Sequence, residues 1–272
     1  WTRFYTPNAS AIVFPRNSEQ IQELISLARS EKLGLVPSGG RTGMSGGACA
    51  INQEIVVSFE KMNAITAFDS YDATATVEPG VITANLQSYA MNKGLYYPVD
   101  FGSSGSSHIA GNIATNAGGI RVIRYGMTRN WVAGLKVVTG TGDLLDLNGG
   151  LVKNNTGYDL RHLFVGSEGT LGFIVEATMK LTDKPMDSTV IVLAVPEMSD
   201  CLAVLQLFRR DLVLNAFEFF SHNALQKVMS TTHLAAPMAT DSPYYVLLEF
   251  EHSDTAALSR AETAFANCLE QD

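Results

Sequence analysis

Residues 102–119 read Gly-Ser-Ser-Gly-Ser-Ser-His-Ile-Ala-Gly-Asn-Ile-Ala-Thr-Asn-Ala-Gly-Gly, and most of these side chains are very small. Glycine adopts backbone conformations that other residues avoid and leaves its N–H groups accessible. Ser, Thr and Asn add short hydrogen-bonding groups without filling the space beside the chain. Successive backbone N–H groups in such loops form anion-binding concavities. The stretch therefore predicts a site where a phosphate or pyrophosphate contacts the backbone directly.

A second run of the same kind, residues 37–47, has five glycines in the nine positions from Gly39 to Gly47. Two such runs predict two walls of one long site, and a long site favours a dinucleotide over a lone phosphate. The alternative is that both runs are flexible turns. Ile109, Ile113 and Ala117 are interleaved in the 102–119 run, however, and predict packing that a flexible linker lacks.

The known nucleotide-binding motifs do not match these runs. A P-loop needs a lysine after its glycines, and residues 39–43 supply none. A Rossmann fingerprint fails at Gly140 and Gly142, because Leu145 stands where its third glycine belongs. A third run, residues 166–172, leads into an apolar strand. We interpret it as a further contact to the same ligand, and the alternative is a tight turn. We therefore expect a nucleotide held by loops.

Composition excludes several classes of protein. Hydrophobic residues make up 46% of the 272 residues and charged residues 17%, which is typical of a folded globular protein. A run of eighteen apolar residues and a signal-peptide segment are both lacking, so a membrane span is not expected. The net charge of −8 argues against a nucleic-acid partner. An anion site would have to draw on local cations, and the candidates are Arg41, Arg121, Arg124 and Arg129. The alternative is that these four arginines are solvated surface side chains.

Cysteine and histidine spacing gives no metal or disulfide pattern. The three cysteines, Cys49, Cys201 and Cys268, are far apart, so no metal site is predicted. The lack of a disulfide pattern predicts a reducing, cytoplasmic location. Residues 43–47 match Gly-x-Ser-x-Gly, but a nucleophile elbow needs a strand before it and a helix after it, and glycine surrounds this one. His108 and His162 are better interpreted as scaffold residues than as bases. Catalytic residues stay unassigned, which suits a site whose cofactor carries the chemistry.

Glycine distribution predicts two domains. All 23 glycines lie between Gly34 and Gly172, and we place the boundary at 184/185, giving domains 1–184 and 185–272. In the first domain we expect a helix from Ser18, strands at 35–37, 55–59 and 74–78, a helix capped by Thr83, and a hairpin joining 135–138 to 144–147. In the second we expect strand 188–195, helix 199–210, strand 214–220, helix 222–230, strand 244–251 and helix 254–270.

Together these segments resemble the FAD-binding domain of FAD-linked oxidases of the vanillyl-alcohol oxidase type. Within that family they are most similar to D-2-hydroxyglutarate dehydrogenases, D-lactate dehydrogenases and the glycolate oxidase flavoprotein subunit. The segments that carry the resemblance are 37–47, 98–102, 107–119, 124–126, 155–160 and 166–172, with weaker matches at 216–219 and 244–249. The resemblance implies an α+β fold: a two-subdomain FAD-binding domain followed by an incomplete, ferredoxin-like α+β substrate domain.

The resemblance also implies a function. A hydride would pass from a D-2-hydroxy acid of the 2-hydroxyglutarate, lactate or glycolate class to FAD, giving the 2-oxo acid. Electrons would then pass to an electron-transfer flavoprotein, a quinone or a partner subunit, and the full-length protein would be a homodimer. The alternatives are an FAD-binding module completed by another chain and an FAD-dependent reductase that uses a nicotinamide.

Two departures from the family are expected to matter. Relatives with covalent FAD use a histidine in the 37–47 run, whereas Arg41 follows Gly39 and Gly40 here, so FAD is expected to be non-covalent. Family members also continue past this point into a half that carries a divalent metal site and most substrate contacts. We therefore expect a fragment of the enzyme, with the acid–base residues beyond Asp272.

The residues expected to bind FAD come from all three runs and from the segment 98–102. The resemblance places the pyrophosphate against the first two runs and the adenine near 169–174. The candidates are Pro37, Ser38, Gly39, Gly40, Arg41, Thr42, Gly43, Met44, Ser45, Pro98, Asp100, Gly102, Ser103, Gly105, Ser106, Ser107, Gly111, Asn112, Ala114, Thr115, Gly118, Gly119, Glu168, Gly169, Gly172 and Ile174.

Overall fold

The computed structural model describes residues 4–149, 151 and 153–270. These residues form two compact units. Unit 1 takes the described residues of 1–119 and 127–184, and unit 2 takes 120–126 together with the described residues of 185–272. The first predicted domain is 1–184, whereas the short segment 120–126 lies with unit 2.

Unit 1 begins with a small parallel sheet in the order β1 (Ala11–Val13), β3 (Ile55–Ser58), β2 (Leu35–Ser38). Helix α1 (Ser18–Glu31) connects β1 to β2, and the helix predicted from Ser18 is confirmed. Its cap is Asn17, whose side chain accepts a hydrogen bond from the Gln20 N–H at 2.9 Å. The chain thus reaches the 37–47 run at the carboxyl end of a half-buried strand, β2.

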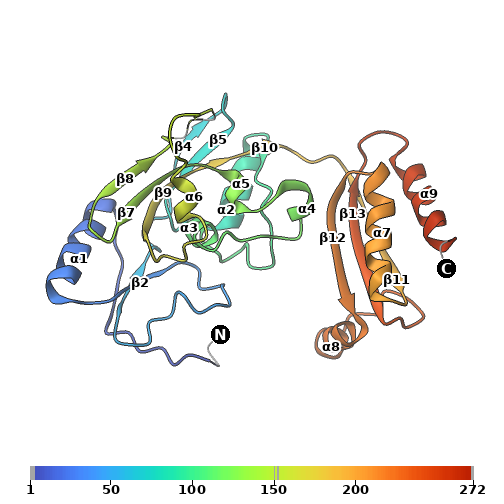
Figure 1. The fold of residues 1–272 in the computed structure, drawn as a ribbon, viewed down its shortest axis with the longest axis horizontal. Coiled ribbons are helices and arrows are strands. Elements are labelled where there is room, and N and C mark those ends of the chain that lie inside the picture. Colours follow the sequence, from blue (N-terminus) through green and yellow to red (C-terminus); the bar gives the residue numbers. More distant parts are fainter. Residues whose placement is uncertain (1–3, 150, 152, 271–272) are drawn as a thin grey trace. The chain divides into compact units, whose positions relative to one another are not determined.

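A five-stranded antiparallel sheet forms the rest of the framework of unit 1 (Figure 1). The predicted hairpin is confirmed, since Leu135 pairs with Leu147 and Val138 with Leu144. Gly142 lies in its turn with φ 92°, a conformation that favours glycine. The strand order is β4 (Ile65–Asp69), β5 (Thr74–Val77), β9 (Gly172–Lys180), β7 (Val132–Thr139), β8 (Leu144–Leu147).

Two hydrophobic cores meet at this sheet. On one side α2 (Thr83–Asn92) and α3 (Ile109–Ala114) bury Leu86, Ile109 and Ile113 against the strands. On the other, α1 packs with β3, β7 and β9. The smaller elements of unit 1 are β6 (Leu95–Tyr96), paired with β10 (Thr182–Asp183), and the short helices α5 (Thr128–Trp131) and α6 (Arg161–Phe164).

The predicted cap at Thr83 is wrong. Thr83 is the first helical residue, Ile82 precedes it, and Ile82 makes no side-chain cap. The buried Thr83 hydroxyl instead lies 2.8 Å from the Ser107 hydroxyl and accepts from the Asn112 amide at 2.7 Å. Thr83 therefore ties α2 to the 102–119 run, a contact that local sequence does not reveal.

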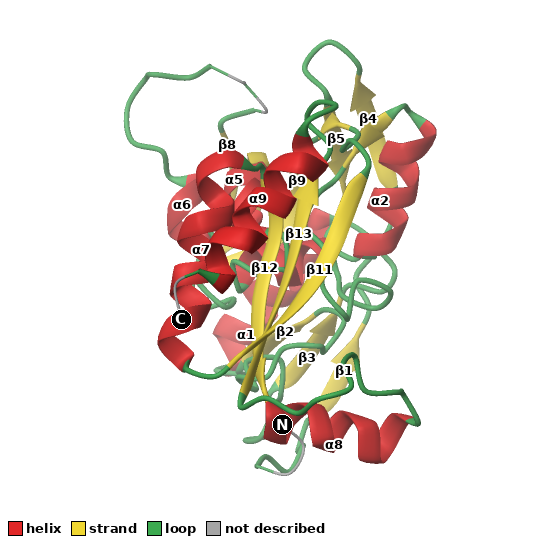
Figure 2. Cartoon of the chain, turned by 90° about the vertical axis from the view of Figure 1, so that its right-hand side faces the viewer, coloured by secondary structure: helices red, strands yellow, loops and turns green. Residues whose placement is uncertain are grey.

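Unit 2 has the predicted alternation of strands and helices. Its three strands are antiparallel in the order β11-β13-β12, and they lie side by side in Figure 2. Helices α7 and α9 cover one face, where Phe208, Leu248 and Phe250 are fully buried. The elements are β11 (Ser188–Val195), α7 (Met198–Asp211), β12 (Leu214–Ser221), α8 (His222–Thr232), β13 (Tyr244–Glu251) and α9 (Ala257–Leu269), and the inserted segment forms α4 (Val122–Tyr125), which contacts β12.

One buried hydroxyl offers a test of the unit 1 core. Tyr97 is 0% exposed, burial raises the pKa of its hydroxyl, and its oxygen has no hydrogen-bond partner among the described residues. We expect Tyr97→Phe to raise the free energy of unfolding by about 1 kcal/mol, because an unpaired buried polar group is removed. Thermal or urea unfolding measures this change in the free energy of unfolding. The control is Tyr89→Phe, whose partly exposed hydroxyl can be hydrated; a destabilised Tyr97→Phe protein would contradict the prediction.

Candidate functional site

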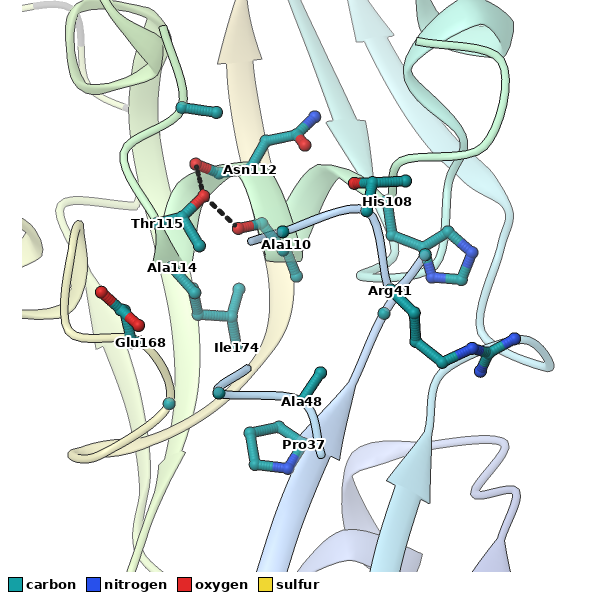
Figure 3. Close-up of a pocket in the computed structure, with 18 of the residues that line it drawn as sticks. Pro37, Arg41, Ala48, His108, Ala110, Asn112, Ala114, Thr115, Glu168 and Ile174 are labelled. Atoms are coloured by element: carbon teal, nitrogen blue, oxygen red, sulfur yellow. Dashed lines mark hydrogen bonds between the residues drawn. The ribbon is translucent and has the colours of Figure 1, made fainter. Parts of the chain in front are cut away.

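A cavity of about 360 Å³ lies within unit 1, and all three glycine-rich runs contribute to its walls (Figure 3). Residues 37–48 form one wall, residues 101–118 a second and residues 167–174 a third. Three phenylalanines, Phe59, Phe101 and Phe173, also line it. The cavity is therefore walled mainly by backbone and small side chains, with aromatic surface that could contact a planar ring.

Glycine brings these walls together. A Cβ atom on Gly40 would lie 2.1 Å from the Ser106 carbonyl oxygen, so only glycine lets the 37–47 run approach the 102–119 run this closely. Gly169, at φ +78°, would place a Cβ 2.4 Å from the Pro37 ring. The first run is thereby packed against both of the others. The glycines predicted to expose backbone to a ligand also set the distances between the walls.

Backbone hydrogen bonds hold the second and third walls to each other. The Gly166 N–H donates to the Ile113 carbonyl at 3.0 Å, and the Glu168 N–H donates to the Ala114 carbonyl at 2.8 Å. Ile113 is fully buried in the core above the five-stranded sheet. These two walls consequently form a fixed frame.

The 37–47 run, in contrast, leaves its donors unused. From Gly40 to Ser45, no backbone N–H has a hydrogen-bond partner among the described residues. Arg41 lies in this stretch with φ 56°, and its guanidinium is 3.4 Å from the Glu60 carboxylate in a half-exposed ion pair. Such exposed pairs contribute little stability, so the Arg41 charge can be redirected to a ligand. Free N–H groups beside a cation suit an anion such as a phosphate.

A carboxylate stands across the cavity from Arg41. Glu168 has φ 52°, a left-handed conformation that is uncommon outside glycine and asparagine. Its carboxylate accepts a hydrogen bond from the Ser45 hydroxyl at 3.2 Å, which joins the first and third walls. Figure 3 shows Glu168 and Arg41 on opposite sides of the view. The first wall thus carries a cation at Arg41 and contacts a carboxylate at Ser45.

The two histidines considered as bases have different surroundings. His108 lines the cavity but is only 8% exposed, packs against Gly39, and has no partner for Nδ1 among the described residues. Its pKa is lowered, first by burial and then by the charge of Arg41, while Glu60 acts in the opposite direction. His162 lies outside the cavity lining, where Nδ1 is 2.8 Å from Arg129 and Nε2 is 3.4 Å from Asp159. These placements agree with scaffold roles.

The structure brings many of the predicted residues to the cavity. These are Pro37, Gly39, Gly40, Arg41, Thr42, Gly43, Ser45, Ser103, Gly111, Asn112, Ala114, Thr115, Gly118, Glu168, Gly169, Gly172 and Ile174. Figure 3 shows Thr115 directly after the end of α3, its hydroxyl bonded back to the Gly111 and Asn112 carbonyls at 3.0 and 3.5 Å. Thr115 therefore presents a satisfied hydroxyl to the cavity.

Other predicted residues lie outside the lining. Ser38 and Pro98 are buried in the framework, the Ser107 hydroxyl is bonded to Thr83, and Met44 is 82% exposed. Gly119 is packed against the Asp100 carbonyl. The members of this group are Ser38, Met44, Pro98, Asp100, Gly102, Gly105, Ser106, Ser107 and Gly119. Several of them hold the walls in place without facing the cavity.

Sequence reasoning also missed lining residues. Phe101 directly precedes the 102–119 run and Phe173 directly follows the 166–172 run, so an apolar residue at the end of each run was the available signal. Phe59 and Pro79 carry no such signal, because they come from separate loops. The full set is Gly46, Gly47, Ala48, Phe59, Pro79, Phe101, His108, Ala110, Ala117, Ser167 and Phe173.

Two further searches cover the described residues only. They contain no group of three or more His, Cys, Asp or Glu side chains that could hold a metal ion. In the same part of the chain, no helix has the length and apolar character needed to span a bilayer.

Comparison with known proteins identifies the family. A family model described as "FAD binding domain" matches residues 9–148, which include the first two walls of the cavity. The chain belongs to the FAD-linked oxidase family. A second model, "FAD linked oxidases, C-terminal domain", matches residues 184–272. The resemblance inferred from the glycine-rich runs is therefore confirmed.

Curated members of the FAD-linked oxidase family match along the whole chain. The chain is 57% identical over 271 residues to a D-2-hydroxyglutarate dehydrogenase of Stutzerimonas stutzeri (strain A1501), covering 100% of this chain and 58% of that protein. It is 36% identical to the mitochondrial D-2-hydroxyglutarate dehydrogenase of Arabidopsis thaliana, covering 93% of this chain and 46% of the relative. The chain thus spans about half the length of these relatives.

Solved structures support the fold. An alkyldihydroxyacetonephosphate synthase superposes with a TM-score of 0.76 at 22% identity, covering 95% of this chain and 50% of that one. At this level of identity the likeness shows the fold alone. The predicted α+β fold, a vanillyl-alcohol oxidase-type FAD domain followed by a second α+β domain, is confirmed, and the second domain matches the C-terminal domain of FAD-linked oxidases.

The contact at Gly40 can be tested by substitution. We expect Gly40→Ala to lower the free energy of unfolding by about 2 kcal/mol, because the added methyl would overlap the Ser106 carbonyl and force the two walls apart. Urea unfolding of the purified chain measures the change. Gly105→Ala is the control, since a Cβ there meets no atom within 4 Å. Equal stability of the two variants would contradict the argument.

Proposed function

We propose that the cavity of unit 1 holds FAD without a covalent bond. The observation that carries the proposal is the set of unpaired N–H groups from Gly40 to Ser45, a stretch in which every residue except Met44 lines the cavity. Those donors suit the pyrophosphate, and Arg41 would add its charge. Arg41 also occupies the place where relatives with covalent FAD carry a histidine, which supports non-covalent binding.

The remaining walls suit the other parts of the cofactor. Glu168 and the 169–174 segment would face the adenosine end, where a carboxylate can accept hydrogen bonds from hydroxyl or amino groups and would repel phosphates. Three phenylalanine rings offer apolar surface to the ring systems. His108, buried and with its pKa lowered, would stay neutral beside the cofactor.

We further propose that the protein containing this chain oxidises a D-2-hydroxy acid to the 2-oxo acid. When bound, FAD supplies the acceptor for the hydride that leaves the substrate carbon. The names of the relatives point to the 2-hydroxyglutarate class. This chain would bind and orient the cofactor and shield it from water. In this proposal the base, most substrate contacts and a divalent metal site lie outside residues 1–272. The proposal also includes an electron acceptor and a homodimer. A cytoplasmic location also stays a prediction.

A cofactor-binding module without its own activity is the second candidate. The observation that favours it is coverage, because the chain spans 58% of the Stutzerimonas relative. Turnover of a D-2-hydroxy acid would exclude the module without its own activity.

The cofactor is tested on the chain itself. We expect purified protein to show the visible absorbance of a bound flavin and to release FAD into the supernatant on acid precipitation, as non-covalent cofactors do. Arg41→Ala is expected to weaken FAD binding by about fivefold, in line with loss of one charge-assisted contact. The matched control is Arg210→Ala, an exposed arginine on α7. Flavin that stays with the precipitate, or a protein that neither retains nor takes up FAD, would contradict non-covalent binding.

The reaction is tested on the longer protein that contains this chain. We expect anaerobic addition of D-2-hydroxyglutarate to bleach the flavin, with D-lactate and glycolate as competitors for the substrate class. The L-enantiomer serves as the control. FAD that is retained but not reduced by any of these acids would favour the module over the enzyme.

A further inference from the structure

The second half of the 37–47 run packs against a tyrosine from another part of unit 1. The Tyr5 ring lies on Gly46, where an added Cβ would be 2.5 Å from the nearest ring carbon. Gly46 has φ 83°, so both its conformation and the space beside it require glycine. The Tyr5 hydroxyl also lies 3.5 Å from the Ser45 carbonyl. Residues 45–47 line the cavity and Tyr5 does not, so Tyr5 packs against them from outside the cavity.

Tyr5 is held in place by the segment that follows it. The Asn8 N–H donates to the Ala50 carbonyl at 2.8 Å, and the Asn8 carbonyl accepts from the Gln53 N–H at 2.8 Å. From Ala11 the chain continues as β1, which pairs with β3. This segment is therefore attached to unit 1 independently of the 37–47 run. The tyrosine ring is a support against which the run can pack.

The run has little backbone hydrogen bonding of its own. Among the described residues, the one backbone–backbone bond of residues 39–48 is a local turn, in which the Cys49 N–H donates to the Gly46 carbonyl at 2.9 Å. Residues 41–45 are all exposed. The second and third walls are joined to each other by backbone bonds, whereas the first wall depends on side-chain contacts and packing.

The side-chain contacts of the run are weak apart from the tyrosine. Arg41 reaches Glu60 in a half-exposed ion pair, which contributes little. The Ser45 hydroxyl reaches the Glu168 carboxylate at 3.2 Å, again at an exposed position. Tyr5 is only 36% exposed, and a largely covered aromatic ring contributes much more contact area. Packing of this ring is consequently the main support of the second half of the run.

We propose that Tyr5 is a positioning residue for the cofactor cavity. By supporting Gly46, it keeps the 37–47 run in the arrangement that presents the N–H groups of residues 40–45 to an anion. Tyr5 itself does not touch the ligand. A run that is already supported loses less conformational freedom on binding, and affinity rises accordingly. The inference rests on the proposed function for the identity of the ligand, but not for the effect on the run.

The test compares variants of the whole chain. Tyr5→Ala removes the ring, whereas Tyr5→Phe keeps the ring and removes only the hydroxyl. Phe4→Ala is the matched control, because Phe4 is the neighbouring aromatic residue and is 84% exposed. Leu181→Ala is the control for general destabilisation, because Leu181 is buried in the core beneath α2 and α3 and does not line the cavity.

Two quantities are measured in each variant. The first is the FAD dissociation constant. The second is the rate at which trypsin cuts after Arg41 in protein without FAD, followed by mass spectrometry of the fragments. Arg41 is half-exposed within the run, and proteolysis of a locally opened segment reports how often that segment opens. Cleavage there therefore reports on the run whether or not the ligand is FAD.

We expect Tyr5→Ala to bind FAD about fivefold more weakly, as when only about a fifth of the molecules hold the run in the binding arrangement. Trypsin should cut faster after Arg41. Tyr5→Phe should keep most of both values, because the hydroxyl contact of 3.5 Å is at the limit of a hydrogen bond. Phe4→Ala should change neither value. Leu181→Ala should lower the melting temperature and leave both values unchanged well below that temperature.

Four outcomes decide the matter. Where the unsubstituted chain binds FAD, an unchanged value of either quantity in Tyr5→Ala would overturn the positioning role. Equal losses in Leu181→Ala would overturn it too, because general destabilisation would then explain the effect. A Tyr5→Phe protein as impaired as Tyr5→Ala would show that the ring contact is not the support. If the unsubstituted chain binds no FAD but Tyr5→Ala is still cut faster after Arg41, the support of the run stands and the proposed cofactor is wrong.

Discussion

Close approach of one backbone to another is the constraint on which this cavity depends. The Gly40 backbone sits where any side chain would overlap the Ser106 carbonyl, and Gly169 sits where one would overlap Pro37. These two contacts bring together loops from three parts of the chain. Without them the walls would stand further apart, and the cavity would lose its depth. Small residues here serve packing between loops as much as contact with a ligand.

Electrostatics then divides the cavity. The 37–47 run offers unpaired N–H groups and the charge of Arg41, whereas its Ser45 hydroxyl contacts the Glu168 carboxylate of the third wall. An anion is favoured beside Arg41 and disfavoured beside Glu168, so an elongated ligand with a charged centre and a neutral, hydroxyl-bearing end has one preferred direction. The fold of an FAD-linked oxidase and this polarity support the same assignment, although they are independent observations.

Much of this was accessible from sequence, for identifiable reasons. The alternation in unit 2 and the 135–147 hairpin follow from periodicity and turn residues, and the glycine-rich runs point to the cavity. Side-chain roles were harder to predict. Thr83 looks like a helix cap, but its hydroxyl binds Ser107 and Asn112, which lie far away in the chain. The place of 120–126 beside β13 depends on ion pairs across about 125 residues, as from Arg124 to Glu251, and no local pattern encodes them.

Strand β9 has a consequence of a different kind. Phe173 and Val175 belong to the core shared with α1, whereas Ile174, Ala177 and Met179 belong to the core beneath α2 and α3. A strand that contributes to both cores joins them into one cooperative unit, so neither should melt alone. The 166–172 run enters this strand directly. The third wall of the cavity is therefore tied to this cooperative unit, which favours a binding surface already formed before any ligand arrives.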